Sequence, residues 1–137
     1  MNIFKRYSIS LGIAGLFLYF FSIWVEEKKE NIMPHNLTTK KEEEVSITLL
    51  PKRYHEKCID LSSKNDLKYG FNSEMNLSFN LHYHDEGEKF FVVEEESINS
   101  LDKIFNPQKR GYYCLMWINT GQKENKTNYF FKILKRS

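Results

Sequence analysis

The chain has 137 residues, with 20 Lys and Arg against 18 Asp and Glu, and its formal net charge is +2. This balance excludes a polybasic nucleic-acid-binding protein and an acidic tail protein as descriptions of the whole chain, so no nucleic-acid partner is expected. A hydrophobic content of 41% with 15% aromatic residues excludes a disordered chain, and two Cys exclude a disulfide-dense scaffold.

The charges are unevenly placed along the chain. Residues 1–25 contain no acidic residue and only two basic ones, Lys5 and Arg6. Setting these two aside leaves 18 basic and 18 acidic residues in 26–137, so that part is formally neutral. The net charge therefore arises from the N-terminus and gives no information about what residues 26–137 bind.

The segment 7–25 is 19 residues long and contains no charged side chain. A helix of that length spans about 28 Å, close to the ~30 Å hydrocarbon core of a bilayer. Tyr7 and Trp24 at its two ends are typical of the aromatic belts at membrane interfaces. The segment predicts a transmembrane signal-anchor helix over 7–25, preceded by a short cytoplasmic N-terminus over 1–6.

Two alternatives to an uncleaved anchor remain open. A cleaved signal peptide also begins with basic and apolar residues, but it ends in small residues, whereas this stretch ends with Trp24 and Val25. A buried helix of a soluble protein would carry an apolar stripe, whereas this stretch is apolar all round. Because basic residues flank both sides, the orientation is ambiguous. We expect a single-pass inner-membrane protein with a periplasmic C-terminal domain, or an endoplasmic reticulum or secretory-pathway membrane protein if the source is eukaryotic.

Residues 26–44 are polar and charged and predict a solvated stalk, and 45–137 predict the extracytoplasmic domain. Short alternating apolar runs in the domain, separated by turn-forming residues, indicate strands. The expected strands are 45–50, 66–73, 77–84, 89–95, 111–119 and 128–135. A turn is expected at 85–88, a polar hairpin loop at 120–127, and either a helical turn or a connection at 97–105. The pattern predicts an all-β antiparallel β-sandwich after one N-terminal transmembrane helix.

Cys58 and Cys114 are 56 positions apart. A disulfide bond closing a loop of this length stabilises a domain by about 4 kcal/mol and forms outside the reducing cytosol. The signal-anchor favours such a bond, and the alternative is two unrelated buried thiols.

Several segments in this order carry a family resemblance: HEKCIDL with Cys58, DLKYGFNS, FNLHYH, KFFVV, GYYCLMWIN and NYFFKIL. Gly111, Tyr112, Cys114 and Asn119 follow a Gly-Tyr-x-Cys-x-x-x-x-Asn spacing. Over about 80 of the 137 residues the chain resembles the GOLD-type β-sandwich, the lumenal module of cargo receptors in the early secretory pathway. The resemblance implies a GOLD- or jelly-roll-like sandwich and pairing of Cys58 with Cys114. Because the receptors' C-terminal span and sorting tail have no counterpart here, the chain is more similar to standalone bacterial envelope proteins with this module, and a vesicle-traffic function is not implied.

His82 and His84 alternate on an expected strand and therefore share a face, opposite Phe79, Leu81 and Tyr83. Two neighbouring imidazoles can bind Cu²⁺, Zn²⁺ or Ni²⁺, and a third ligand would be needed for a catalytic site. His55 would supply it only if the fold brings it close. The alternative is a polar outer face on which two His happen to alternate.

No sequence motif for nucleophilic catalysis, phosphate binding or zinc hydrolysis occurs in the chain. We therefore expect a non-catalytic, membrane-anchored module that binds a protein or another envelope component and holds no cofactor. The alternative is a periplasmic copper- or zinc-binding protein that uses the His82/His84 pair.

Overall fold

The computed structural model describes residues 36–136. The predicted transmembrane helix over 7–25 and most of the predicted stalk lie outside the described residues. Within the described part, no helix is long and apolar enough to cross a membrane.

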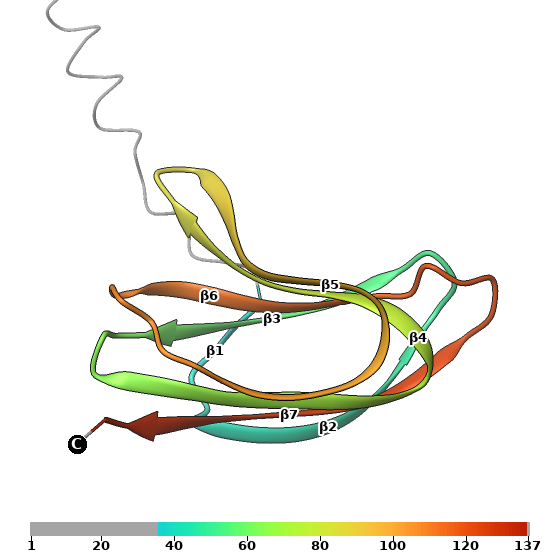
Figure 1. The fold of residues 1–137 in the computed structure, drawn as a ribbon, viewed down its shortest axis with the longest axis horizontal. Helices are drawn as coiled ribbons and strands as arrows, with labels where there is room; N and C mark the ends of the chain where they lie inside the picture. Colours follow the sequence, from blue (N-terminus) through green and yellow to red (C-terminus); the bar gives the residue numbers. More distant parts are fainter. Residues whose placement is uncertain (1–35, 137) are drawn as a thin grey trace, which may run out of the picture. The chain divides into compact units, whose positions relative to one another are not determined.

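The described residues form seven β-strands and no helix (Figure 1). The strands are β1 (Leu37–Thr38), β2 (Glu42–Leu49), β3 (Tyr54–Leu61), β4 (Asn65–Asp85), β5 (Glu88–Phe105), β6 (Gly111–Ile118) and β7 (Asn125–Lys135). Hydrogen bonding follows the order β1-β3-β6-β4-β7-β2, and β5 pairs with β4 outside this path. Because the described residues form strands and no helix, the all-β prediction is confirmed for them. All strand pairs are antiparallel, as predicted, except the short parallel pair of β1 with β3.

The long strand β4 joins the two layers of this curled sheet (Figure 1). Its first part, 65–73, pairs with β7, and its later part, 78–83, pairs with β6. Between Asn72 and Leu77 the register with β5 shifts, as at a β-bulge, and this irregularity lets the strand bend from one layer into the other. One layer therefore contains β1, β3, β6 and the end of β4, and the other contains β2, β7 and its start.

The core lies between the two layers and is rich in aromatic side chains. The rings of Trp117 on β6 and Tyr129 on β7 stack with centroids 4.3 Å apart, which places side chains of both layers in direct contact. Phe79 packs on Trp117 at 5.8 Å. The alternation expected from the sequence at Leu67, Tyr69, Phe71, Leu77, Phe79 and Leu81 is confirmed, since all six side chains are buried.

The strand boundaries differ from the sequence expectations at the N-terminal side of the domain. β1 and β2 begin at Leu37 and Glu42, inside the predicted stalk, so regular β-structure starts before position 45. β3 was not among the expected strands. The inward-facing positions include Glu43 on β2 and Lys57 on β3. These charged residues interrupt the apolar alternation by which a strand is predicted from sequence.

Three further expectations are corrected, two of them in the β4–β5 hairpin. The expected strands 66–73 and 77–84 are parts of one strand, β4. Residues 97–105 form neither a helical turn nor a connection, because β5 continues to Phe105 opposite Leu67. Most β5 side chains are exposed, so this strand lacks the alternation of a half-buried strand. The loop expected at 120–127 is shorter, since β7 begins at Asn125.

Candidate functional site

The three central strands of one layer bring Cys58, Cys114 and His82 into one row. Cys114 on β6 lies in register with Cys58 on β3 and with His82 on β4. Residues in register across antiparallel strands point to the same face of the sheet. This face is opposite the core, because the core-facing residues of β6 are Tyr113, Leu115 and Trp117. Glu56 and Asn80 occupy the neighbouring row of the same face, on either side of Met116.

Cys58 and Cys114 form a disulfide bond, as predicted, and both residues are fully buried. Their Cα atoms are 4.0 Å apart. The bond joins two adjacent strands of one layer and does not connect the two layers of the sandwich.

His82 is also fully buried, with 0% of its surface exposed. Its Nδ1 lies 2.7 Å from the Asn80 side-chain oxygen Oδ1. Because an amide oxygen only accepts hydrogen bonds, the ring donates from Nδ1–H. In the neutral ring this leaves Nε2 with a free lone pair, pointing away from Asn80.

The free nitrogen of His82 faces a carboxylate. Nε2 is 3.1 Å from Glu56 Oε1 but lacks hydrogen-bond geometry. A carboxylate so close would favour the protonated ring. Burial, followed by the positive charges of Lys89 and His84, lowers the pKa of His82 to about 4. We take the neutral form, because the ring has no solvent contact and makes no hydrogen bond with Glu56. The buried Nε2 of His82 then faces a second acceptor, the carboxylate of the half-buried Glu56.

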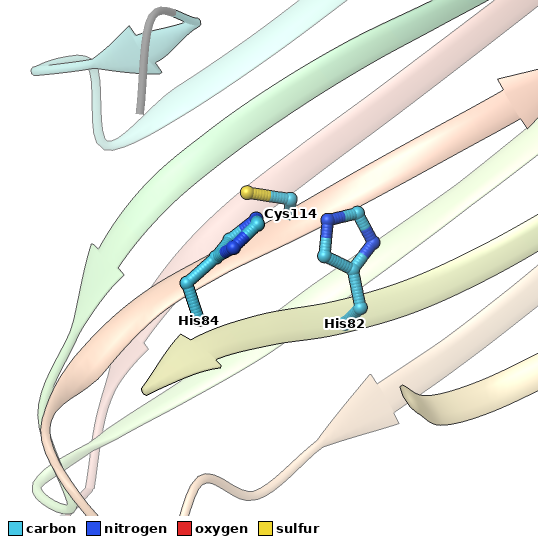
Figure 2. Close-up of side chains that lie close together, drawn as sticks. All are labelled: His82, His84 and Cys114. Atoms are coloured by element: carbon cyan, nitrogen blue, oxygen red, sulfur yellow. The ribbon is translucent and has the colours of Figure 1, made fainter. Parts of the chain in front are cut away.

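His84 stands beside this group at the surface. Its ring is exposed, and its centroid is 5.1 Å from that of His82. Figure 2 shows both rings projecting from the same side of β4, with the Cys114 side chain of β6 beside them. One ligand-type atom each from His82, His84 and Cys114 lies within 4.8 Å of the other two. The same holds for Glu56, Cys58 and Cys114. Since the sulfurs form a disulfide, they are not metal ligands in this state, and metal binding by His82 and His84 stays a prediction.

His55 does not join His82 and His84, because it lies on the opposite, core-facing side of β3. Its Nε2 is 3.2 Å from the Tyr129 hydroxyl, and its ring stacks on Trp117. Burial, followed by the positive charge of Lys57, lowers its pKa. His55 belongs to the seam between the layers, where Lys57 Nζ lies 2.7 Å from Glu43 Oε2.

Glu56 and Asn80 are the site residues whose roles the sequence did not indicate. Asn80 lies two positions before His82, which is the spacing of one strand face, but its role in orienting that ring needs the observed distance. Glu56 lies two positions before Cys58, which is the spacing of one strand face. This signal was missed because β3 was not expected to be a strand.

A second candidate surface lies near the tip of the β4–β5 hairpin. Phe90, Phe91 and Val92 are exposed by 39%, 51% and 38% respectively. Leu81 pairs with Val93 and His82 pairs with Phe91, so Val92 is an extra residue on β5, as in a β-bulge. We call these three residues the hairpin apolar surface. Phe90 stacks on Tyr83, and Phe91 packs beside His82.

These features define a disulfide-bonded antiparallel β-sandwich. Among solved structures, the fold is similar to the pre-peptidase C-terminal domain of a collagenase from Bacillus anthracis. The TM-score is 0.53 at 14% sequence identity, and the match covers 76% of this chain and all of that one. No protein-family model and no curated protein sequence matches the chain. The likeness concerns the fold alone, and the finer GOLD-type assignment stays a prediction.

Proposed function

We propose that the chain is a single-pass membrane-anchored protein whose extracytoplasmic β-sandwich is a non-catalytic binding module. The apolar segment over 7–25 supports the anchor. The buried Cys58–Cys114 disulfide supports an oxidising compartment outside the cytosol. Together these two features support the proposal of a periplasmic location on the inner membrane.

The observation that carries the binding role is the hairpin apolar surface. Soluble domains rarely expose three consecutive large apolar residues, unless these residues serve an interaction. The bulge at Val92 explains how adjacent side chains become exposed together, because bulges redirect side chains at sheet edges. Val93, the next residue, is only partly buried against the core.

The chemistry of the partner follows from the residues beside this surface. Glu94 and Glu96 continue the same strand and are exposed. A complementary surface therefore combines apolar side chains with nearby basic ones. We infer that the partner is a protein of the envelope with an apolar contact surface flanked by Lys or Arg.

Site-specific photocrosslinking in intact cells tests this proposal. The full chain carries a photoreactive amino acid either at Phe91 or at Leu50, a matched control in the β2–β3 connection with the same 51% exposure. We expect the Phe91 probe, and not the Leu50 probe, to yield one protein adduct, crosslinked through a segment with apolar and basic residues. Adducts only to lipid, or the same adducts from both positions, would contradict a protein-binding surface at the hairpin.

A binding measurement with the purified partner completes the test. Val92→Asp places a charge in the hairpin apolar surface and should weaken binding at least tenfold, as expected for the centre of an interface (about 1.4 kcal/mol per tenfold). Leu50→Asp should leave the affinity unchanged. Equal affinities of both variants would locate the interface elsewhere.

A further inference from the structure

Beside the buried ring of His82, two hydrogen-bond acceptors face each other with no donor between them, and this points to a bound cation. His82 is fully buried, and its Nε2 has no hydrogen-bond partner. Glu56 Oε1, 3.1 Å away, is also an acceptor. Two acceptors at this separation repel each other unless a positive centre lies between them.

Two sulfur atoms lie next to this pair. Cys114 is in register with His82, and Glu56, Cys58 and Cys114 offer ligand-type atoms within 4.8 Å of one another. Two thiolates, an imidazole and a carboxylate are a ligand set that suits Zn²⁺. We infer that reduction of the Cys58–Cys114 disulfide opens a four-coordinate Zn²⁺ site formed by Cys58, Cys114, His82 and Glu56.

The reaction that opens the site requires an external dithiol reductant. The dithiol gives two electrons and two protons to the Cys58–Cys114 bond, becomes a disulfide itself, and leaves two protein thiols. Zn²⁺ binding then displaces the two thiol protons to solvent, because the metal binds thiolates. The oxidised protein lacks both sulfur ligands.

The surroundings of His82 match those of a metal-binding imidazole. Such rings usually donate their other N–H to a protein oxygen, which fixes the tautomer. Asn80 Oδ1 accepts from Nδ1 at 2.7 Å and so directs Nε2 toward Glu56. Zn–S and Zn–N distances of about 2.3 and 2.1 Å place ligand atoms roughly 3.5–4 Å apart. Glu56, Cys58 and Cys114 offer ligand atoms within 4.8 Å of one another, and His82 offers one within 4.8 Å of Cys114. Side-chain movements would bring all four around one ion.

The exposed neighbour His84 gives the site an access route. Its ring lies at the surface, and one of its nitrogens is within 4.8 Å of a ring nitrogen of His82 and of the Cys114 sulfur. A Zn²⁺ ion from solvent can contact His84 first and then reach the buried ligands. The inference goes beyond the proposed binding role, because it uses the face of β3, β6 and β4 and needs neither the anchor nor the hairpin apolar surface.

Zn²⁺ titration of the full chain in detergent, in oxidised and reduced form, tests the inference. With a chromogenic chelator as competitor, we expect one Zn²⁺ per reduced chain and at least a hundredfold weaker binding by the oxidised chain. Zn²⁺ should also raise the melting temperature of the reduced protein, because it binds the folded form. Co²⁺ should give the absorption of a tetrahedral thiolate complex.

Variants separate the proposed ligands from their neighbours. His82→Ala should lower the Zn²⁺ affinity of the reduced protein at least tenfold, and Glu56→Gln should lower it measurably. Asp60→Asn is the matched control, since this carboxylate lies on the same face of β3 but binds Arg110, and it should leave affinity unchanged. Cys58→Ser/Cys114→Ser removes the disulfide without supplying thiolates and should bind no Zn²⁺.

Three outcomes would overturn the inference. Equal Zn²⁺ affinity of the oxidised and reduced forms would show that the sulfurs are not ligands. An unchanged affinity in His82→Ala would exclude the buried imidazole. A reduced chain that stays unfolded with Zn²⁺ present, by circular dichroism, would show that no folded site forms.

Discussion

Cys58 and Cys114 are directly opposed on the neighbouring strands β3 and β6, and their disulfide lies in the same row as the buried ring of His82. A bond in this position ties together strands that are 56 residues apart in sequence. It also occupies the sulfur of Cys114 beside His82 and that of Cys58 beside Glu56. One covalent bond thus bears on both the stability of the domain and the ligand chemistry of its outer face.

Removal of the disulfide should destabilise the domain substantially. Closing a loop of this length restricts the unfolded chain and contributes about 4 kcal/mol in the chain-entropy model. We expect Cys58→Ser/Cys114→Ser to lower the free energy of unfolding by roughly this amount in urea titrations of metal-free protein. A change below about 1 kcal/mol would mean that the unfolded chain gains little freedom when the bond is absent.

Gly70 should not tolerate a side chain. A Cβ atom there would lie 2.4 Å from the Leu101 carbonyl oxygen and 2.7 Å from the ring of Phe130. Because Leu101 O belongs to the backbone of β5, relief requires a strand to move, and Gly70→Ala should cost about 1–3 kcal/mol. Gly111→Ala is the control, since its Cβ would meet only Tyr113 at an ordinary 3.6 Å. Equal melting temperatures of the two variants would disprove the close approach of β5.

Asn125 should be essential for the bend of β4. Its Oδ1 accepts from Ser73 Oγ at 2.8 Å and from Met75 N at 3.1 Å, and its Nδ2 donates to Met75 O at 2.9 Å. Asn125→Ala removes the partner of both Met75 backbone groups, whereas Ser73 Oγ keeps its contact with Thr127 Oγ1, and the expected loss is about 3 kcal/mol. Asn128→Ala, an exposed position on the same strand, should cost less than about 0.5 kcal/mol. Thermal unfolding of both variants compares the two sites.

The seam between the layers should make stability depend on pH. Burial alone would raise the pKa of Glu43, but Lys57 and Lys40 outweigh it and hold the pKa below its ordinary value of 4.5. A carboxyl whose pKa is depressed on folding adds stability above its unfolded pKa and loses it as pH falls through its folded pKa. The wild-type melting temperature should therefore fall more steeply below pH 4.5 than that of Glu43→Gln.

The control for this pH dependence is Glu44→Gln, which alters an outward-facing neighbour on the same strand. It should retain the wild-type slope. A Glu43→Gln profile that runs parallel to the wild type would exclude the ion pair as a source of acid sensitivity.

The strands that could be predicted from the sequence are those with regularly placed apolar side chains. The start of β6 was expected, and so were the inward side chains of β4, because a half-buried strand alternates with a period of two. β3 was missed because its inward positions include His55 and Lys57. Their partners, Tyr129 and Glu43, come from the other layer and are recognisable only after folding.

The candidate site was predictable only in part, for a similar reason. The shared face of His82 and His84 follows from their spacing, and the disulfide was expected. The burial of His82 was not, since Phe91 reaches its ring from β5, nine residues further along a strand with little alternation. Glu56 approaches from β3, and a contact between strands so distant in sequence depends on register, which spacing within a single strand does not contain.

The location of the β-sandwich outside the cytoplasm is the claim on which the proposed function depends. Protease treatment of spheroplasts from a bacterial host that expresses the full chain, followed by alkylation and mass spectrometry, tests it most directly. We predict that protease removes residues 36–136 from intact spheroplasts and that Cys58 and Cys114 are recovered as one disulfide-linked pair. A protected domain with both thiols alkylated would place it in the cytosol and contradict the account.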